Sequence, residues 1–276
     1  NYLKNCNKKS MLHTAKYMHQ ILSLSNDAYE EIFQEIDTSG LVEKRGIIYV
    51  WTNKNLKSRN LEIKIRDQLG IEQKLLTKKE ILELEPNLNP VFDAGVIYES
   101  AMHARDPHGI LKKIFKLYLD KGGKFIQTNI TSIKQSAFDE TIIKSENEEF
   151  KFEKSVIASG AFSKKLTDQL GENIPLDTER GYHVHFKGKD HLISRPVIFL
   201  DRGFGMTPMN QGLRAVGTVE LGGLENPPSE KRIEYVIKCA KELLPQLGKH
   251  EDEWLGFRPT LPDFLPILGP SLKNKN

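Results

Sequence analysis

Apolar side chains near the start of the chain recur at intervals of three and four residues. Between Met11 and Ile36 this spacing places them on one face of a helix, and the pattern is weakest at residues 23–26. The pattern therefore predicts one long helix or two abutting ones. Caps, glycines and prolines predict further helices at residues 56–69, 77–85, 106–121 and 229–247.

Segments rich in β-branched and aromatic residues predict strands. In the first part of the chain these segments are residues 46–52, 95–99, 124–128, 130–134, 141–145, 149–152 and 156–158. Between Arg180 and Leu221 four successive segments, separated by Gly and Asp turns, predict a mainly antiparallel sheet; they are residues 182–187, 196–200, 204–209 and 213–220. No repeat with a period of 20 to 50 residues occurs, which argues against a solenoid or a propeller.

The composition favours a folded enzyme. A chain of 276 residues can bury a sizeable core, and a net charge of +3 without a dense basic stripe argues against nucleic-acid binding. Cys6 and Cys239 lie far apart with no CxxC pair, which argues against a disulfide framework and a zinc site. We therefore expect a reducing, cytoplasmic compartment.

The ends of the chain and its apolar runs bear on membranes and on completeness. No apolar run reaches the ~20 residues that span a bilayer, and residues 1–10 are polar and lysine-bearing, unlike a signal peptide. We expect no transmembrane segment, and peripheral association at the inner face of the plasma membrane stays open. Because the chain begins at Asn1 without a methionine and ends just after an apolar segment, we expect a piece of a longer product.

The segment SVIASGAFS, residues 155–163, runs from an apolar strand into a turn of small residues and then a helix. Small side chains at Ser159, Gly160 and Ala161 let a ligand approach the backbone, and the free N–H groups of the helix favour an anionic group. On this segment by itself, an ordinary structural connection between strand and helix is the favoured interpretation.

The segment WLGFRPTLPDFLPILGP, residues 254–270, holds an arginine in a rigid frame. Arg258 is surrounded by apolar residues and prolines, which would pre-organise its guanidinium as a fork for a carboxylate. The alternative is a structural ion pair of Arg258 with Asp263 or Glu253. The spacing alone leaves both interpretations open.

WLGFRPTLPDFLPILGP resembles the carboxyl-terminal GxRPxxxDxxPxIG signature of FAD-dependent D-amino-acid oxidoreductases, and SVIASGAFSKKL resembles their second flavin-domain strand and turn. The fragments RGYH, MTPM, GTVELGGL and GFRPTLPD occur together in the order of the D-amino-acid dehydrogenase small-subunit group, which is related to glycine oxidases. The resemblance covers nearly the whole chain. The chain departs from the family by lacking the G-x-G-x-x-G that holds the FAD pyrophosphate and the glycine-rich segment that follows its last residues, which puts tight FAD binding by this chain in doubt.

The resemblance implies an α/β fold of two interleaved domains. An incomplete glutathione-reductase-like FAD-binding domain would comprise residues 1–38, 106–171 and 256–276, and a substrate domain with a mixed, mainly antiparallel sheet would comprise residues 39–105 and 172–255. The implied reaction is oxidative deamination of a small, D-configured amino acid to a 2-oxo acid and ammonia, with electrons passing to a quinone or another acceptor. Two alternatives are a glycine or sarcosine oxidase that uses oxygen and a non-catalytic truncated remnant.

The resemblance also implies residue roles at the substrate. Arg258 would bind the α-carboxylate, and Glu220 would hold the ammonium or set the side-chain preference, unless it is a solvated carboxylate at a strand end. Tyr182 and His183 would line the pocket, although alternation on a strand sends only one of them inward. His183 as a catalytic base is the less favoured interpretation. Met206 would pack in the core or form a pocket wall.

At the cofactor, the resemblance implies contacts from three segments. The backbone of Ile130 would meet the FAD adenine, the turn of Ser159, Gly160 and Ala161 would lie near the cofactor, and residues Pro266 to Gly269 would pass close to the flavin ring. No metal site is expected. The histidines and aspartate of HARDPH, residues 103–108, are better explained by a helix start at Asp106 and Pro107.

Overall fold

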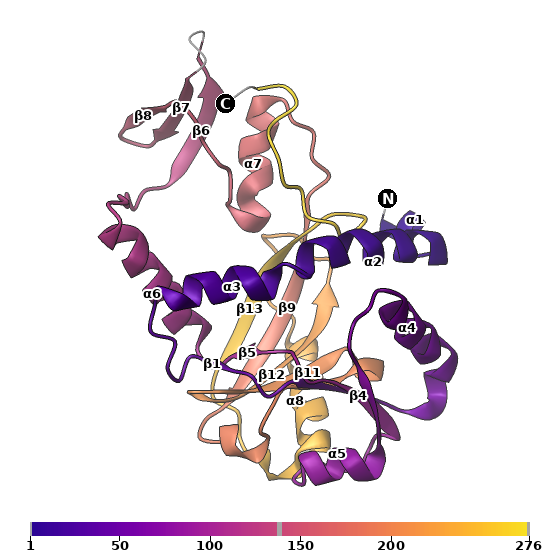
Figure 1. Ribbon diagram of the computed structural model, residues 1–276. Coiled ribbons are helices and arrows are strands. Elements are labelled where there is room, and N and C mark those ends of the chain that lie inside the picture. Colours follow the sequence, from indigo (N-terminus) through magenta and orange to yellow (C-terminus); the bar gives the residue numbers. More distant parts are fainter. Residues whose placement is uncertain (1, 137–139, 275–276) are drawn as a thin grey trace.

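An eight-stranded sheet organises the larger, lower part of the chain (Figure 1). In this computed structural model, which describes residues 2–136 and 140–274, the strand order is β13-β9-β12-β11-β10-β2-β4-β3. Neighbours pair antiparallel except β10 and β2, which confirms the expected mixed, mainly antiparallel sheet. The bounds are β2 Ile47–Trp51, β3 Lys74–Thr77, β4 Ala94–Tyr98, β9 Asp177–Phe186, β10 Val197–Phe199, β11 Phe204–Met209, β12 Gly212–Glu220 and β13 Glu253–Thr260.

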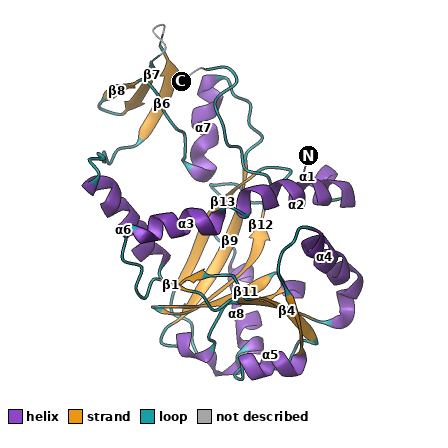
Figure 2. Cartoon of the chain, viewed as in Figure 1, coloured by secondary structure: helices purple, strands orange, loops and turns teal. Residues whose placement is uncertain are grey.

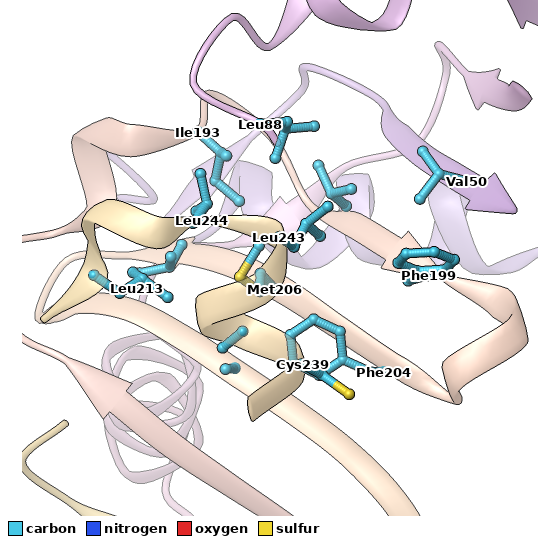
Figure 3. Close-up of a cluster of buried hydrophobic side chains, with 14 of the residues drawn as sticks. Val50, Leu88, Ile193, Phe199, Phe204, Met206, Leu213, Cys239, Leu243 and Leu244 are labelled. Atoms are coloured by element: carbon cyan, nitrogen blue, oxygen red, sulfur yellow. The ribbon is translucent and has the colours of Figure 1, made fainter. Parts of the chain in front are cut away.

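One face of this sheet is covered by α8 (Glu230–Leu243) and α5 (Lys78–Leu84) and forms the main core. Alternation along β9 sends Tyr182, Val184 and Phe186 to this face, and all three are almost fully buried. Leu243 and Cys239 of α8 pack against them and against residues of β11 and β12 (Figure 3). The opposite face of β9 carries the remaining, less hydrophobic positions.

The helices follow the sequence patterns closely. The long pattern at the start forms α2 (Lys8–Leu22) and α3 (Ser25–Gln34), which break at the expected seam and run across the sheet (Figures 1 and 2). The capping box of Thr77 and Glu80 is present, and Asp106 caps the helix that begins at Pro107. The other elements in the first 120 residues are α1 (Tyr2–Asn5), β1 (Val42–Glu43), α4 (Leu56–Gln68), β5 (His103–Ala104) and α6 (Pro107–Asp120).

A smaller part of the chain lies above the large sheet in Figure 1. Its three strands, which the sequence predicted, pair as an antiparallel meander, and a short 3₁₀ turn with a helix follows them. Gln169, which follows the helix, connects this helical segment to the strands. Its side chain accepts from the N–H of Ile133 at 3.1 Å and donates to the carbonyl of Thr131 at 3.2 Å. The bounds are β6 Ile130–Gln135, β7 Thr141–Ser145, β8 Glu149–Phe152, η2 Gly160–Phe162 and α7 Ser163–Thr167.

Two predicted strands, at residues 124–128 and 156–158, are wrong. Both segments are irregular, and neither pairs with another strand among the described residues. Phe125 is 61% exposed and Val156 is 89% exposed, so β propensity without a hydrogen-bonded partner does not produce a strand here. The division into two domains stays a prediction.

Two strands of the large sheet were missed. The sequence interpretation treated residues 254–270 as a proline-framed segment, whereas residues 253–260 form β13. Pro259 is compatible with this because β13 is an edge strand and need not donate from every N–H. The short edge strand β3 was missed as well. No helix in the described ranges is both long enough and apolar enough to cross a bilayer.

A buried carboxylate joins α5 to the segment before β10. Glu85, which is 2% exposed, accepts from the N–H of Ser194 at 2.9 Å and from Nε of Arg195 at 3.1 Å. Glu85→Ala should lower the free energy of unfolding by about 3–5 kcal/mol, because it leaves a largely buried guanidinium without its counter-charge. Glu83→Ala on the same helix should change it by less than about 0.5 kcal/mol, because its pair with Lys79 is exposed. Urea denaturation of both variants checks this, and equal losses would contradict it.

A buried histidine makes stability depend on pH. His103 is 7% exposed, and neither ring nitrogen has a hydrogen-bond partner among the described residues. Burial lowers its pKa below the ordinary 6.5 despite the charge of Glu43. The unfolded chain therefore takes up a proton that the folded chain refuses, so stability is intact above pH 6.5 and falls as the pH drops below it. His103→Leu should flatten this dependence in denaturation series between about pH 7.5 and 5. The same change at exposed His108 should leave it unaltered; an unchanged slope in His103→Leu would refute the assignment.

Candidate functional site

A pair of glycines creates a hollow on the face of the sheet that points away from α8. Gly181 of β9 and Gly256 of β13 lie directly opposite each other in the antiparallel register. A Cβ on Gly181 would lie 2.7 Å from Nη2 of Arg258, and one on Gly256 would lie 2.1 Å from a ring carbon of Trp254. The guanidinium and the indole therefore occupy the space that two side chains would otherwise fill.

A pocket of about 130 Å³ opens beside this pair. It is formed by the adjacent strands β9, β12 and β13. Among the described residues that line it, Arg258 carries the only charge, and none has a carboxylate. These residues are Gly181, Tyr182, His183, Val216, Trp254, Gly256, Phe257 and Arg258. The arrangement suits a small anion with an uncharged remainder.

The guanidinium of Arg258 makes no hydrogen bond or ion pair with any described residue. Both acids considered as structural partners bind elsewhere: Glu253 pairs with His250 at 2.8 Å, and Asp263 accepts from the N–H of Leu265 at 3.2 Å. Glu179, directly opposite Arg258 in the register, also lies beyond the 4.0 Å limit of an ion pair. The structural ion-pair interpretation is therefore wrong, and the guanidinium remains available to a ligand.

An aromatic stack lies next to Arg258. The rings of Trp254 and His183 are 4.7 Å apart and nearly parallel, and His183 stacks in turn on His185 at 5.0 Å. Nε of Arg214 donates to Nε2 of His185 at 2.9 Å, so this nitrogen is the acceptor of a neutral ring. Burial, assisted by the charge of Arg214, lowers the pKa of His183 to about 4, which leaves His183 uncharged at neutral pH.

Of the neighbours Tyr182 and His183, only His183 directs its side chain to the pocket face. The hydroxyl of Tyr182 points toward α8, where it donates to Glu220 at 2.5 Å and accepts from the N–H of Ser229 at 3.1 Å. Burial and the bond to Glu220 raise the pKa of Tyr182. Tyr182 thus borders the pocket as part of β9 and not as a polar side chain.

Glu220 and Met206 do not line this pocket, and their roles at the substrate stay predictions. Glu220 contacts Nε of Arg180 at 3.4 Å and Nε of Arg232 at 3.6 Å, so it is neither a solvated carboxylate nor a pocket group. A bulge after Gly217 shifts the register and places Glu220 opposite Arg180, whose fully buried charge requires a partner. Met206 is fully buried in the core (Figure 3).

The sequence interpretation missed most of the pocket wall. Trp254, Gly256 and Arg258 alternate along one strand face, but this signal becomes readable only when residues 253–260 are assigned as a strand. Nothing in the sequence marked Val216 or Gly181 as residues of a pocket wall. Their role follows from the pairing of three strands that are far apart along the chain.

The segments assigned to the cofactor lie on the side of the smaller part. Gly160 has a left-handed backbone with φ of 56°, and a Cβ there would meet nothing within 4 Å; Ser159 and Gly160 are exposed, whereas Ala161 is buried. The turn packs on β13, where the rings of Phe162 and Phe257 meet edge to face at 6.2 Å.

The other two segments assigned to the cofactor differ in structure. Pro266 to Gly269 follow β13 as an exposed segment, and Ser271 beyond them bonds to Glu172. Ile130 begins β6 and pairs with Ser145. The exposed backbone at Ser159 and Gly160 leaves room for part of a flavin nucleotide, whereas no G-x-G-x-x-G loop for its pyrophosphate occurs in this sequence. Within the described ranges, no group of three or more His, Cys, Asp or Glu side chains could hold a metal ion.

Relatives among known proteins match nearly the whole of this chain. A D-amino-acid oxidase of Bradyrhizobium diazoefficiens is 30% identical over 261 residues, which cover 93% of this chain and 62% of the relative. A D-amino acid dehydrogenase of Vibrio atlanticus is 27% identical, over 99% of this chain and 67% of the relative. The chain thus spans about two thirds of the length of these relatives.

Solved structures agree on the fold. Glycine oxidase from Geobacillus kaustophilus matches with a TM-score of 0.78 at 21% identity, over 91% of this chain and 69% of that one. L-proline dehydrogenase from P. horikoshii also gives a TM-score of 0.78, at 18% identity and over 95% and 70% of the two chains. The sequence profile described as FAD dependent oxidoreductase matches residues 7–276. The chain therefore belongs to the family of FAD-dependent oxidoreductases that includes D-amino-acid oxidase.

Proposed function

We propose that the protein to which this chain belongs oxidises a small D-amino acid to an imine, which water converts to a 2-oxo acid and ammonia. The observation that carries the proposal is the guanidinium of Arg258, which lies in a pocket without a protein partner among the described residues. The relatives named D-amino-acid oxidase and D-amino acid dehydrogenase support this substrate class. The D configuration rests on those names.

Arg258 would bind the α-carboxylate through two parallel hydrogen bonds. A guanidinium matches a carboxylate in shape and charge, and such paired bonds also fix the orientation of the ligand. The pocket volume of about 130 Å³ corresponds to about four water molecules at ~30 Å³ each, which suits a small amino acid. With its carboxylate bound to Arg258, the substrate would place its α-carbon against Trp254, Val216 and His183.

The same pocket would favour the uncharged amine that oxidation requires. An ammonium group beside Arg258 would be repelled by its charge, and no carboxylate lines the described pocket to compensate. The indole of Trp254 and the side chain of Val216 add desolvation, which disfavours a charged amine further. The substrate nitrogen is therefore expected to lose its proton readily, which makes its lone pair available to assist loss of the α-hydrogen.

FAD, on which the family depends, supplies the acceptor for the hydride of the α-carbon. The residues proposed to contact FAD are Ile130 through its backbone, the turn of Ser159, Gly160 and Ala161, and the segment from Pro266 to Gly269. What supports them is the packing of the Ser159–Ala161 turn on the strand that carries Arg258.

The electrons would then pass to a quinone or another acceptor, and the relatives leave two options. One is named a dehydrogenase and the other an oxidase, so use of oxygen, as in a glycine or sarcosine oxidase, is the second candidate. Reducing the full-length flavoprotein anaerobically with D-alanine or sarcosine and then adding oxygen or a quinone separates the two.

Replacement of Arg258 tests the carboxylate anchor. In the full-length enzyme, Arg258→Leu should lower kcat/KM for D-alanine by about 30- to 5,000-fold, the equivalent of about 2–5 kcal/mol for one partner of a desolvated charge pair. Arg258→Lys should recover only part of this, because an ammonium lacks the fork of a guanidinium. Steady-state kinetics provide the measurement, and an unchanged kcat/KM in Arg258→Leu would remove the proposed function.

Gly181 tests whether the position of the guanidinium matters. Gly181→Ala introduces a Cβ 2.7 Å from Nη2 of Arg258 and should displace the guanidinium, lowering kcat/KM by about 100-fold. In an Arg258→Leu background the same substitution should cost little more, because both changes remove one interaction. Additive losses in this double-mutant cycle would show that Gly181 acts independently of Arg258.

A further inference from the structure

The imidazole of His183 lies in an aromatic stack beside the pocket. The rings of Trp254, at 4.7 Å, and His185, at 5.0 Å, are both nearly parallel to it. No ring nitrogen of His183 bonds to a described residue, although the side chain lines the same pocket as Arg258. The stack therefore fixes the ring plane and leaves its hydrogen-bonding atoms for a ligand.

The spacing between His183 and the guanidinium of Arg258 suits an α-amino acid. The guanidinium lies over Gly181, whose Cα is about 6.7 Å from that of His183, two residues along the same strand face. The amine nitrogen and the carboxylate carbon of an α-amino acid are about 2.5 Å apart, and the carboxylate oxygens reach farther. One hydrogen bond of about 2.9 Å at each end therefore lets a single α-amino acid link the two side chains.

We propose that His183 accepts a hydrogen bond from the α-amino group of the substrate while Arg258 holds the carboxylate. This inference rests on the proposed function. Of the described side chains that line the pocket, His183 has the only uncommitted acceptor: the indole N–H can only donate, and the Tyr182 hydroxyl is bound to Glu220. His183 is thereby a substrate-binding residue and not the base that removes the proton.

The charges around the stack keep His183 in the accepting form. Arg214 donates to His185 on the far side of the stack, and the described pocket contains no carboxylate that would stabilise a protonated His183. Desolvation and the charge of Arg214 hold its pKa at about 4. A neutral imidazole can accept from the amine without competing with it for a proton.

The test separates hydrogen bonding from stacking. His183→Phe keeps an aromatic ring between Trp254 and His185 but removes the acceptor, whereas His183→Gln keeps an acceptor. In the full-length enzyme, kcat/KM for D-alanine and the inhibition constant of propionate, which has the carboxylate but no amine, are measured for each variant. His183→Phe should lower kcat/KM by about 3- to 10-fold, the effect of one lost hydrogen bond, and leave propionate inhibition within about twofold. His183→Gln should restore most of the loss.

Two controls sharpen the result. His191→Phe, at an exposed histidine of the 190–192 turn, should behave as wild type in both assays. Glu179→Gln tests the acid nearest to Arg258 in the register and should change neither measurement. If Glu179→Gln weakens D-alanine but not propionate while His183→Phe does neither, the amine is held by the acid and the proposal is overturned.

The remaining outcomes distinguish a failure of the proposed role of His183 from a failure of the proposed function. Parallel losses for D-alanine and propionate in His183→Phe, or equal losses in the Phe and Gln variants, would overturn the role of His183 while leaving amino-acid oxidation intact. A wild-type enzyme that neither binds nor oxidises D-alanine, glycine or sarcosine would overturn the proposed function, and the role of His183 with it.

Discussion

The close approach of two strands through Gly181 and Gly256 is the constraint on which the site depends. Because neither residue has a Cβ, the guanidinium of Arg258 and the indole of Trp254 can lie against the sheet, with their outer sides exposed. Both side chains come from one strand face and converge over one cross-strand pair. The pocket is thus defined by backbone pairing between β9 and β13, whose hydrogen bonds hold it more firmly than a loop could.

Two arginines on this strand pair show how the two faces differ. Arg180 is fully buried toward α8, where Glu220 and the carbonyl oxygen of Pro227, at 2.8 Å, satisfy it. Arg258 is exposed on the opposite face, and no described residue satisfies it. A charge without a partner beside apolar side chains is stabilised most by a ligand of opposite charge. The contrast shows a structural role for the buried arginine and leaves the exposed one for the ligand that the proposed function requires.

The sequence predicted elements whose signals are local and missed those that depend on partners. The helix over residues 56–68 ends before Gly70, as its pattern indicated, because periodicity and the glycine stop both lie within the segment. Residues 124–128 have the composition of a strand but no neighbour to pair with. Glu220 lies outside the pocket because a bulge that no local pattern reveals turns it toward Arg180. Arg258 could be named from its motif, whereas the absence of a partner required the fold.

The charge pattern of the pocket face bears on what the site can select. Arg258 and Arg214 both lie on this face, and burial together with the charge of Arg214 lowers the pKa of His183 and His185 between them, so that His183, with a pKa of about 4, is neutral. Such a face attracts a carboxylate and disfavours a cationic group. Under the proposed function, recognition would begin with the acid group of the substrate, and the volume beside Trp254 and Val216 would admit only a small remainder. The same neutrality leaves His183 able to contact an amine without protonating it, so binding and the uncharged state that oxidation requires are favoured by one arrangement of charges.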